Sequence, residues 1–207
     1  MYNLQREFFY CTPIFFHDVQ NAKEINNKLL DNILDWKEKD KEGIIRSNNL
    51  GWHSSYDMNL KDEYQDIVNI INNKLDELST IEEYNSRKKL VVHDMWANVS
   101  PKYAYNGYHI HTSSLWSGVY YVQSPPNCGV IKFTNYGLST LLQPDYEKEH
   151  GNQQPHQWTT VEYEPIEGRV IFFPSWLGHE VQQNLTDVEG QDGYRISISF
   201  NSRQKEK

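Results

Sequence analysis

The sequence predicts a mainly β protein with helices at its N-terminal end. Two segments before Arg87 carry apolar residues at three- and four-residue steps, the period of an amphipathic helix. After Arg87 the pattern changes to short apolar or alternating runs, separated by Gly, Pro and Asn. Closely spaced short strands of this kind are typical of a sandwich or barrel rather than a parallel α/β sheet.

The two helical segments are residues 18–40 and 61–84. In the first, the apolar stripe runs from Ala22 to Trp36, and Asp18 is expected to cap the N-terminus of the helix. In the second, the apolar stripe consists of Tyr64, Ile67, Ile71, Leu75 and Leu78.

Eight strand-like runs follow, and the last has two distinct faces. Because side chains alternate along a strand, Arg195, Ser197 and Ser199 share one face, whereas the other face is apolar. We expect the apolar face to pack against the helices, and the polar face either to line a ligand cavity or to meet solvent. The eight runs are residues 89–99, 103–110, 115–123, 128–134, 158–164, 168–173, 178–184 and 194–201.

Length and composition limit the classes of protein. At 207 residues the chain fits a single integrated domain, with residues 1–87 as a helical support region and 88–207 as the core. A formal net charge of −8 argues against a nucleic-acid partner, because nonspecific affinity for nucleic acid comes from Lys and Arg that neutralise phosphates. No run is apolar enough for a membrane span, and the pattern of a signal peptide is absent, so we expect a cytoplasmic protein. Cys11 and Cys128 lack metal-site spacing, which favours two free thiols over a disulfide.

Three histidines are the strongest indication of chemistry. His109 and His111 are two positions apart, so both can face one side of a strand or of its end. His179 follows a short run that ends at Pro174. Neutral imidazoles are common metal ligands, so the three side chains could meet at one ion. The simpler alternatives are surface histidines on a strand edge and a histidine packed in the core.

Arg195 and Ser197 could bind an anion near that metal. A planar guanidinium matches both oxygens of a carboxylate. The alternative for Arg195 is an ion pair with an acidic neighbour. Tyr120 and Asn98 are further candidates to line the cavity and contact a cofactor, with core packing as the alternative for each.

Several blocks, in this order, resemble the 2-oxoglutarate/Fe(II) oxygenase family found in marine bacteria and phages. They are Gly51–Ser54, Trp96–Val99, Tyr105–His111, Ser117–Val122, Phe173–Val181 and Arg195–Asn201.

This resemblance implies a double-stranded β-helix, a jelly-roll or cupin-like core with Fe(II) between its sheets. It implies that His109 and His179 bind the iron and that Arg195, supported by Ser197, holds the distal carboxylate of 2-oxoglutarate. The implied reaction uses O2, hydroxylates a C–H bond of the substrate and decarboxylates 2-oxoglutarate to succinate. A phage-encoded member would act in the host cytoplasm.

His111 departs from the pattern of the wider superfamily, which has Asp or Glu at this position. We expect His111 to be the third ligand, which keeps the open positions on the iron but makes the site one unit more positive. The alternatives are a site completed by water, or by a carboxylate such as Asp94 or Glu180.

Other classes of function stay open at this stage. One is a three-histidine cupin-type dioxygenase that does not use 2-oxoglutarate, and another is a non-enzymatic β-barrel binding protein. For an oxygenase, the substrate could be a small molecule, a protein side chain or a modified nucleobase. The long irregular segment at residues 137–157 could be a lid. A homodimer through an exposed edge strand is one permitted assembly.

Overall fold

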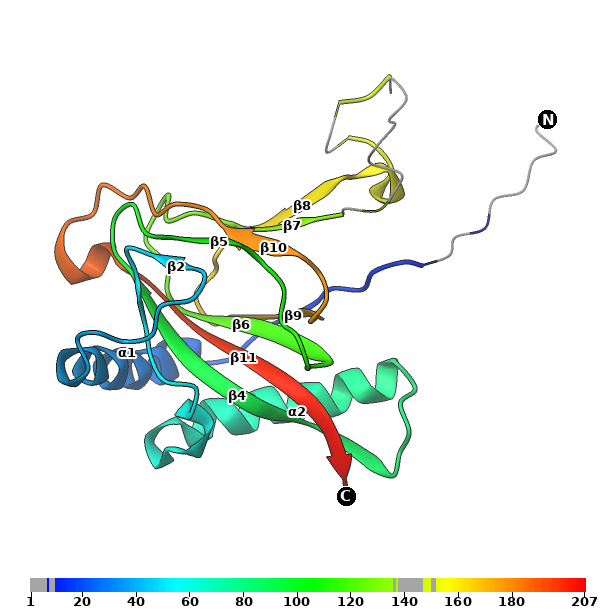
Figure 1. Cartoon of the computed structure of the whole chain (residues 1–207), viewed down its shortest axis with the longest axis horizontal. Coiled ribbons are helices and arrows are strands. Elements are labelled where there is room, and N and C mark those ends of the chain that lie inside the picture. The colour runs from blue at the N-terminus through cyan, green and yellow to red at the C-terminus, as the bar shows by residue number, and fades with distance from the viewer. Residues whose placement is uncertain (1–6, 8–9, 136, 138–146, 150–151) are drawn as a thin grey trace.

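Two antiparallel sheets face each other in the computed structural model, which describes residues 7, 10–135, 137, 147–149 and 152–207 (Figure 1). The larger sheet consists, in spatial order, of β1 (Phe15–Asp18), β9 (Arg169–Pro174), β6 (Trp116–Gln123), β11 (Arg195–Glu206), β4 (Lys88–Ser100) and β3 (Trp52–His53). The smaller sheet consists of β2 (Asn48–Asn49), β5 (Tyr105–His109), β10 (His179–Val181), β7 (Ile131–Thr134) and β8 (Thr160–Tyr163). The mainly β architecture expected from the strand-like runs is confirmed.

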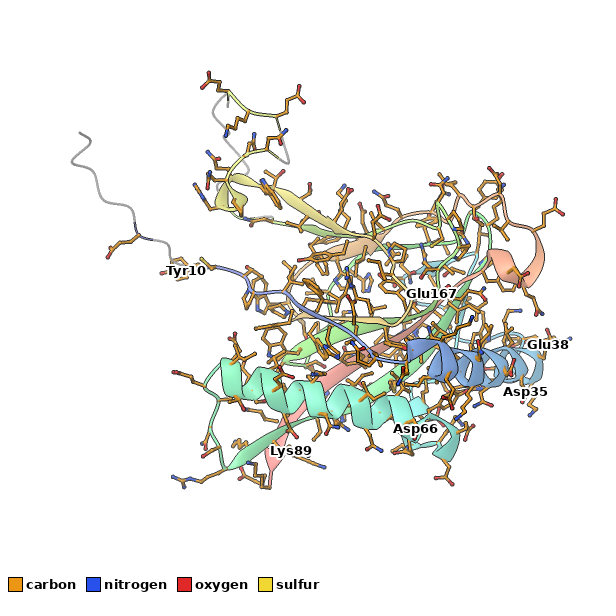
Figure 2. All side chains as sticks on the ribbon, turned by 180° about the vertical axis from the view of Figure 1, so that it is seen from behind. Tyr10, Asp35, Glu38, Asp66, Lys89 and Glu167 are labelled. Carbon is orange, nitrogen blue, oxygen red and sulfur yellow. The ribbon has the colours of Figure 1, made fainter. Side chains whose placement is uncertain are left out.

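Two helices cover the outer face of the larger sheet, as Figure 1 shows. They are α1 (Ala22–Lys39) and α2 (Gln65–Ile81), and short 3-10 helices span Met58–Leu60, Asp62–Tyr64, Pro155–Gln157 and Gly190–Gly193. Each helix buries one apolar stripe against the sheet and turns charged side chains such as Asp35, Glu38 and Asp66 to solvent (Figure 2).

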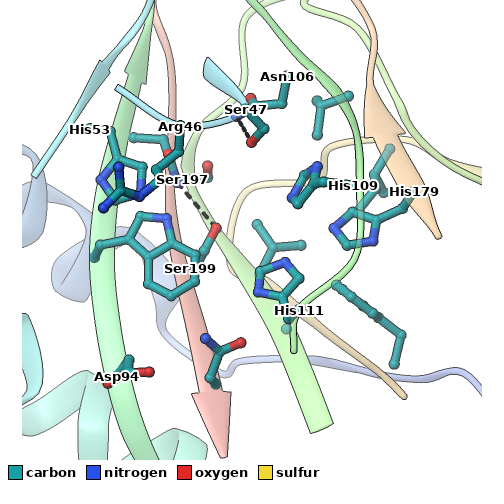
Figure 3. A pocket seen from close by; sticks show the side chains of 18 of the residues that line it. Arg46, Ser47, His53, Asp94, Asn106, His109, His111, His179, Ser197 and Ser199 are labelled. Atoms are coloured by element: carbon teal, nitrogen blue, oxygen red, sulfur yellow. Dashed lines mark hydrogen bonds between the residues drawn. The ribbon is translucent and has the colours of Figure 1, made fainter. Parts of the chain in front are cut away.

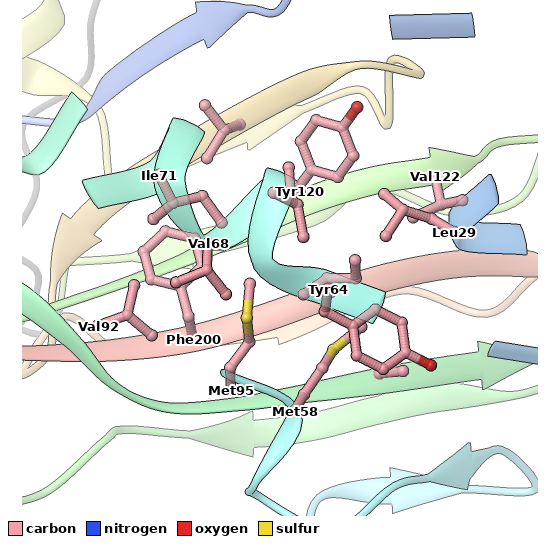
Figure 4. Packing of buried hydrophobic residues seen from close by; sticks show 14 of the residues in the cluster. Leu29, Met58, Tyr64, Val68, Ile71, Val92, Met95, Tyr120, Val122 and Phe200 are labelled. Atoms are coloured by element: carbon pink, nitrogen blue, oxygen red, sulfur yellow. The ribbon is translucent and has the colours of Figure 1, made fainter. Parts of the chain in front are cut away.

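The main hydrophobic core lies between these helices and the larger sheet. Figure 4 shows Leu29 of α1 and Val68 and Ile71 of α2 in the same cluster as Tyr120 of β6 and Phe200 of β11. A smaller apolar cluster lies on the other face of the sheet. It consists of Val119, Tyr121, Ile131, Phe133, Ile171, Phe173 and Leu177.

Alternation along β11 gives the two faces that the sequence predicts. Ile196, Ile198 and Phe200 are buried in the helix-side core, whereas Arg195 and Ser197 line a cavity on the inner side. The inner, polar face therefore meets a cavity rather than bulk solvent.

The structure corrects the predicted beginning of the first helix. Asp18 is not its N-cap, because it is the last residue of β1 and its carboxylate accepts hydrogen bonds from the Arg169 guanidinium at 2.6 and 2.8 Å. The helix begins at Ala22, after Asn21 in a left-handed conformation. The second helix is also shorter than predicted, because 3-10 turns precede Gln65.

Several other expectations concern parts of the chain outside the two sheets. Most of the segment predicted as a lid, including residues 138–146 and 150–151, lies outside the described residues. The boundary at residue 87 stays a prediction. Cys11 and Cys128 are free, the first exposed and the second buried. Within the described part of the chain, no helix is both long enough and apolar enough to span a membrane.

Candidate metal centre

Three histidines from two strand ends converge between the sheets. His109 is the last residue of β5 and pairs directly with His179, the first residue of β10. His111 lies just beyond β5, where its backbone N–H donates to the carbonyl of Ser175 at 2.9 Å. The ring centroid of His109 is 4.3 Å from that of His179 and 5.1 Å from that of His111.

These histidines can all present a ligand atom to one point. Within the described residues, they form the one group of His, Cys, Asp or Glu side chains that could hold a metal ion, with ligand atoms within 4.8 Å of one another. The group contains neither Asp94 nor Glu180. Asp94 lines the nearby cavity, and the Glu180 carboxylate pairs with Lys132 Nζ at 3.3 Å.

Local hydrogen bonds prepare two of the rings for a metal. The Nδ1–H group of His109 donates to the carbonyl of Gly107 at 2.8 Å, and that of His179 donates to the carbonyl of Leu177 at 2.9 Å. An imidazole that donates from Nδ1 keeps an unprotonated Nε2, which is the form that binds metal.

Burial keeps the imidazoles neutral. Loss of solvent lowers the pKa of His111 to about 4 and that of His179 to about 3, with a further lowering by the neighbouring His109. Burial also lowers the pKa of His109. Near neutral pH, protons therefore compete weakly for the nitrogens that a metal would bind.

Arg195 is a buried cation with an unused donor. Its Nη1 donates to the carbonyl oxygens of Cys128, Gly129 and Gln182, so these partners carry no formal charge. Its Nη2 is buried and has no hydrogen-bond partner. A buried charge in this state is costly, and an anionic ligand would both neutralise it and accept the free hydrogen bond. This orphaned donor fits a carboxylate of 2-oxoglutarate.

One cavity of about 460 Å³ joins the cation to the histidines. Figure 3 shows the three histidine rings on one side of this cavity, and His53, Ser197 and Ser199 across from them. The predicted site residues that line it are His109, His111, His179, Arg195, Ser197 and Asn98.

Tyr120 does not join them, and this prediction is wrong. Its side chain lies on the helix side of β6, where its hydroxyl donates to Asn26 Oδ1 at 2.6 Å. Because alternate residues face opposite sides of a strand, the neighbouring Tyr121 lines the cavity instead.

Sequence reasoning missed several other residues of the cavity wall. Asn201 continues the polar face of β11, so the alternation that selects Arg195 and Ser197 would have found it. Trp96 shares a face of β4 with Asn98 and could have been found in the same way. Arg46 comes from a loop far earlier in the chain, where no sequence pattern marks it.

Comparisons with known proteins agree with this geometry. A family model described as "Putative 2OG-Fe(II) oxygenase" matches residues 94–201, which is more than half of the chain. Among curated proteins, no sequence matches.

Solved structures of similar shape have low sequence identity. A prolyl-4-hydroxylase from Pseudomonas putida has a TM-score of 0.60 at 12% identity, covering 92% of this chain and 91% of its own. The viral collagen prolyl hydroxylase of Paramecium Bursaria Chlorella virus-1, solved with 2-oxoglutarate, has a TM-score of 0.55 at 13% identity, with 91% and 94% covered. HygX from Streptomyces hygroscopicus, solved with nickel, 2-oxoglutarate and hygromycin B, has a TM-score of 0.58 at 13% identity, with 92% and 82% covered.

These likenesses confirm the double-stranded β-helix, and the family match confirms the resemblance drawn from the motifs. The chain therefore belongs to the 2-oxoglutarate/Fe(II) oxygenase family.

Proposed function

We propose that this protein is an Fe(II)- and 2-oxoglutarate-dependent oxygenase that hydroxylates a C–H bond of its substrate. The observation that carries the proposal is the buried, unpartnered Nη2 of Arg195, which shares one cavity with three neutral imidazoles. A cupin-type dioxygenase that does not use 2-oxoglutarate would leave this donor without a purpose.

In this proposal His109, His111 and His179 hold the metal. When bound, Fe(II) supplies oxygen activation, with one atom of O2 going to the substrate and the other to succinate as 2-oxoglutarate loses carbon dioxide. The rings of His109 and His179 are already held by hydrogen bonds to backbone carbonyls, so these two side chains need little reorganisation when the metal binds. Three neutral ligands give a more positive centre than two histidines and a carboxylate would.

Arg195 and Ser197 hold the distal carboxylate of 2-oxoglutarate. The guanidinium is fixed by three backbone carbonyls, so its free Nη2 points in a defined direction. Ser197 lies two residues along the same face of β11 and can donate a second hydrogen bond. Asn98 donates to Ser199 Oγ at 3.1 Å and forms the neighbouring part of the wall.

The substrate class stays broad in this proposal. A cavity of about 460 Å³ has room for 2-oxoglutarate and part of a second molecule. A small molecule or a protein side chain would fit, in keeping with the hygromycin B and collagen named for the similar structures. The protein would act in the cytoplasm, and an exposed edge strand would allow a homodimer.

The test is anaerobic addition of Fe(II) and 2-oxoglutarate, followed by visible spectroscopy. We expect a metal-to-ligand charge-transfer band in the wild type, a much weaker one in Arg195→Ala at equal 2-oxoglutarate, and none in His111→Ala. Asn26→Ala, a change outside the cavity, serves as the control and should keep the band. Absence of the band in the wild type would refute the proposed function. A band that survives in His111→Ala would refute only the third ligand.

A further inference from the structure

Arg46 is a second cation on the cavity wall, and the proposed binding of metal and 2-oxoglutarate leaves it unused. Its Nε donates to the Tyr56 hydroxyl at 3.2 Å, and its Nη1 donates to the carbonyl of Ile45 at 3.0 Å. Among the described residues, no carboxylate forms an ion pair with it, although the chain carries a net charge of −8. Arg169, by contrast, is paired with Asp18. Arg46 is therefore a cation whose partners are all neutral, which leaves its charge available to an anion.

The loop that carries Arg46 is tied to both sheets. On one side of it, the backbone N–H of Ile44 donates to the carbonyl of His53 in β3, at 2.8 Å. On the other side, the carbonyl of Ser47 accepts from the N–H of Gly107 in β5, also at 2.8 Å. The position of Arg46 is therefore set relative to β5, the strand that ends at the first histidine of the candidate metal centre.

The residue that holds the guanidinium is itself fixed. The ring of Tyr56 lies edge-on to the rings of His53 and Trp96, at 5.2 Å from each, and its carbonyl accepts from the N–H of Met95 at 3.1 Å. Arg46, Tyr56, His53 and Trp96 all line the cavity. Figure 3 shows Arg46 next to His53, across the cavity from the three histidines of the candidate metal centre. A molecule bound between them would meet the guanidinium on one side and the metal on the other.

The two cations of the cavity differ in depth. Arg195 is only 2% exposed, whereas Arg46 is exposed to solvent. An anion held by Arg195 therefore lies at the buried end, and Arg46 remains for a second molecule that enters afterwards. Two separate cations at two depths fit two anionic ligands better than one.

The charge of the loaded cavity favours an anion as well. With three neutral imidazoles as ligands, the charges of Fe(II) and of 2-oxoglutarate cancel, and both arginines then add positive charge. Among the described residues that line the cavity, Asp94 is the one acidic side chain. Figure 3 shows Asp94 at the other end of the wall from Arg46. A substrate with a negative group would therefore be attracted to the Arg46 end of the opening.

We propose that Arg46, held by Tyr56, binds an anionic group of the primary substrate, a carboxylate or a phosphate, and so determines which molecules are oxidised. This inference rests on the proposed function, because it takes the co-substrate to occupy Arg195. The planar guanidinium suits both groups, since its fork of donors matches two oxygens at once. The substrate class narrows to molecules that place such a group at the opening while a C–H bond reaches the metal.

The experiment is an NMR titration of isotope-labelled protein, loaded with Zn²⁺ and saturating 2-oxoglutarate, at constant ionic strength. Sulfate is added as the stand-in for a phosphate group, and acetate as the stand-in for a carboxylate. The chain has six arginines, so their side-chain Nε–H signals are few. We expect the signal of Arg46 to shift saturably with at least one of the two anions. Arg203 is the matched control, because it is exposed, donates from Nε to the carbonyl of Ser113 at 2.8 Å and does not line the cavity.

The affinity of the variants is followed at Trp96, whose indole N–H signal reports the same wall when Arg46 is replaced. We expect Arg46→Gln to bind the anion about 10-fold more weakly or worse, the loss of one charge-assisted hydrogen bond. Arg203→Gln should bind it like the wild type. If Arg46→Gln does not fold, Arg46→Glu is the second variant, and anion binding that survives there would overturn the inference.

The outcomes separate this inference from the proposed function. No saturable shift of Arg46 with either anion would overturn the inference, and so would equal shifts of Arg46 and Arg203. A shift in the metal-free protein that 2-oxoglutarate abolishes would also overturn it, because Arg46 would then hold the co-substrate. A shift with sulfate alone would support a phosphorylated substrate, one with acetate alone a carboxylate, and shifts with both an anion site open to either. Failure of the proposed function is seen separately, as the absence of the charge-transfer band in the wild type.

Discussion

The ring of Trp96 stacks on two imidazoles and forms part of the cavity wall next to the candidate metal centre. It stacks on His53 at 5.4 Å and 8° and on His111 at 5.8 Å and 22°. His111 in turn stacks on His179 at 5.2 Å and 10°. Trp96 and His111 therefore each stack with two other rings. This packing holds the ring of the proposed third ligand in place.

His53 should make the stability of the metal-free protein depend on pH. Burial lowers its pKa below the ordinary 6.5, although its Nδ1–H group donates to the carbonyl of Ser54 at 2.5 Å. As the pH falls through about 6.5, the unfolded chain takes up a proton that the folded chain does not, so the free energy of unfolding decreases. We expect His53→Phe, which keeps an aromatic ring beside Trp96, to have a shallower fall of Tm between about pH 7.5 and pH 5.

The measurement is differential scanning fluorimetry with a chelator present, so that the metal ligands contribute equally to every variant. His93→Gln is the matched control, since the side chain of His93 is 42% exposed. It should show the slope of the wild type. Identical slopes in His53→Phe and the wild type would contradict this prediction.

At the scale of elements, strand length separates what the sequence could predict from what it could not. The eight strand-like runs each correspond to an observed strand, because alternation or an apolar run is visible over several residues. β2 and β3 have two residues each, which is too short for any period. β1 was missed because Asp18 precedes an apolar helical stripe and so resembles an N-cap. Its pairing with Arg169, 151 positions later, is a tertiary contact that local pattern cannot reveal.

β6 has little room for change, because it lies between the helix-side core and the cavity. A Cβ added at Gly118 would meet the ring of Phe200 and would lie 2.5 Å from the carbonyl oxygen of Ile171. We expect Gly118→Ala to destabilise the fold by about 1–3 kcal/mol, because the strand itself must shift. Thermal or urea unfolding measures this, with Gly107→Ala as the control, since its nearest atom would be 3.9 Å away. Equal stability of the two variants would show that β6 can move at little cost.

At the scale of the whole molecule, the cavity is assembled from parts that are far apart in the sequence. The motif blocks predicted His109, His179 and Arg195, because each of them lies on or beside a strand of the core. Arg46 and Tyr56, which also line the cavity, come from the N-terminal region that the sequence predicted only as a support. The wrong prediction for Tyr120 has a simple cause. The sequence shows that β6 alternates, but not which of its two faces turns toward the cavity, and the other face carries Tyr121.

Ligand binding should stabilise the whole fold in two separable steps. The metal-free protein contains three imidazoles that can present ligand atoms to one point, and a buried guanidinium with an unused donor, so a metal and an anion would each add interactions to the folded state alone. We expect Zn²⁺, which has no redox chemistry, to raise Tm, and 2-oxoglutarate added afterwards to raise it again. At a ligand concentration of about 100 Kd the second step contributes about 2.7 kcal/mol, or roughly 5–10 °C for a chain of this size.

The variant Arg195→Gln should keep the rise in Tm with Zn²⁺ and lose the further rise with 2-oxoglutarate. In the wild type, glutarate, which lacks the keto oxygen, should give a smaller second rise than 2-oxoglutarate. A second shift that persists in Arg195→Gln would mean that 2-oxoglutarate is held by other groups than Arg195.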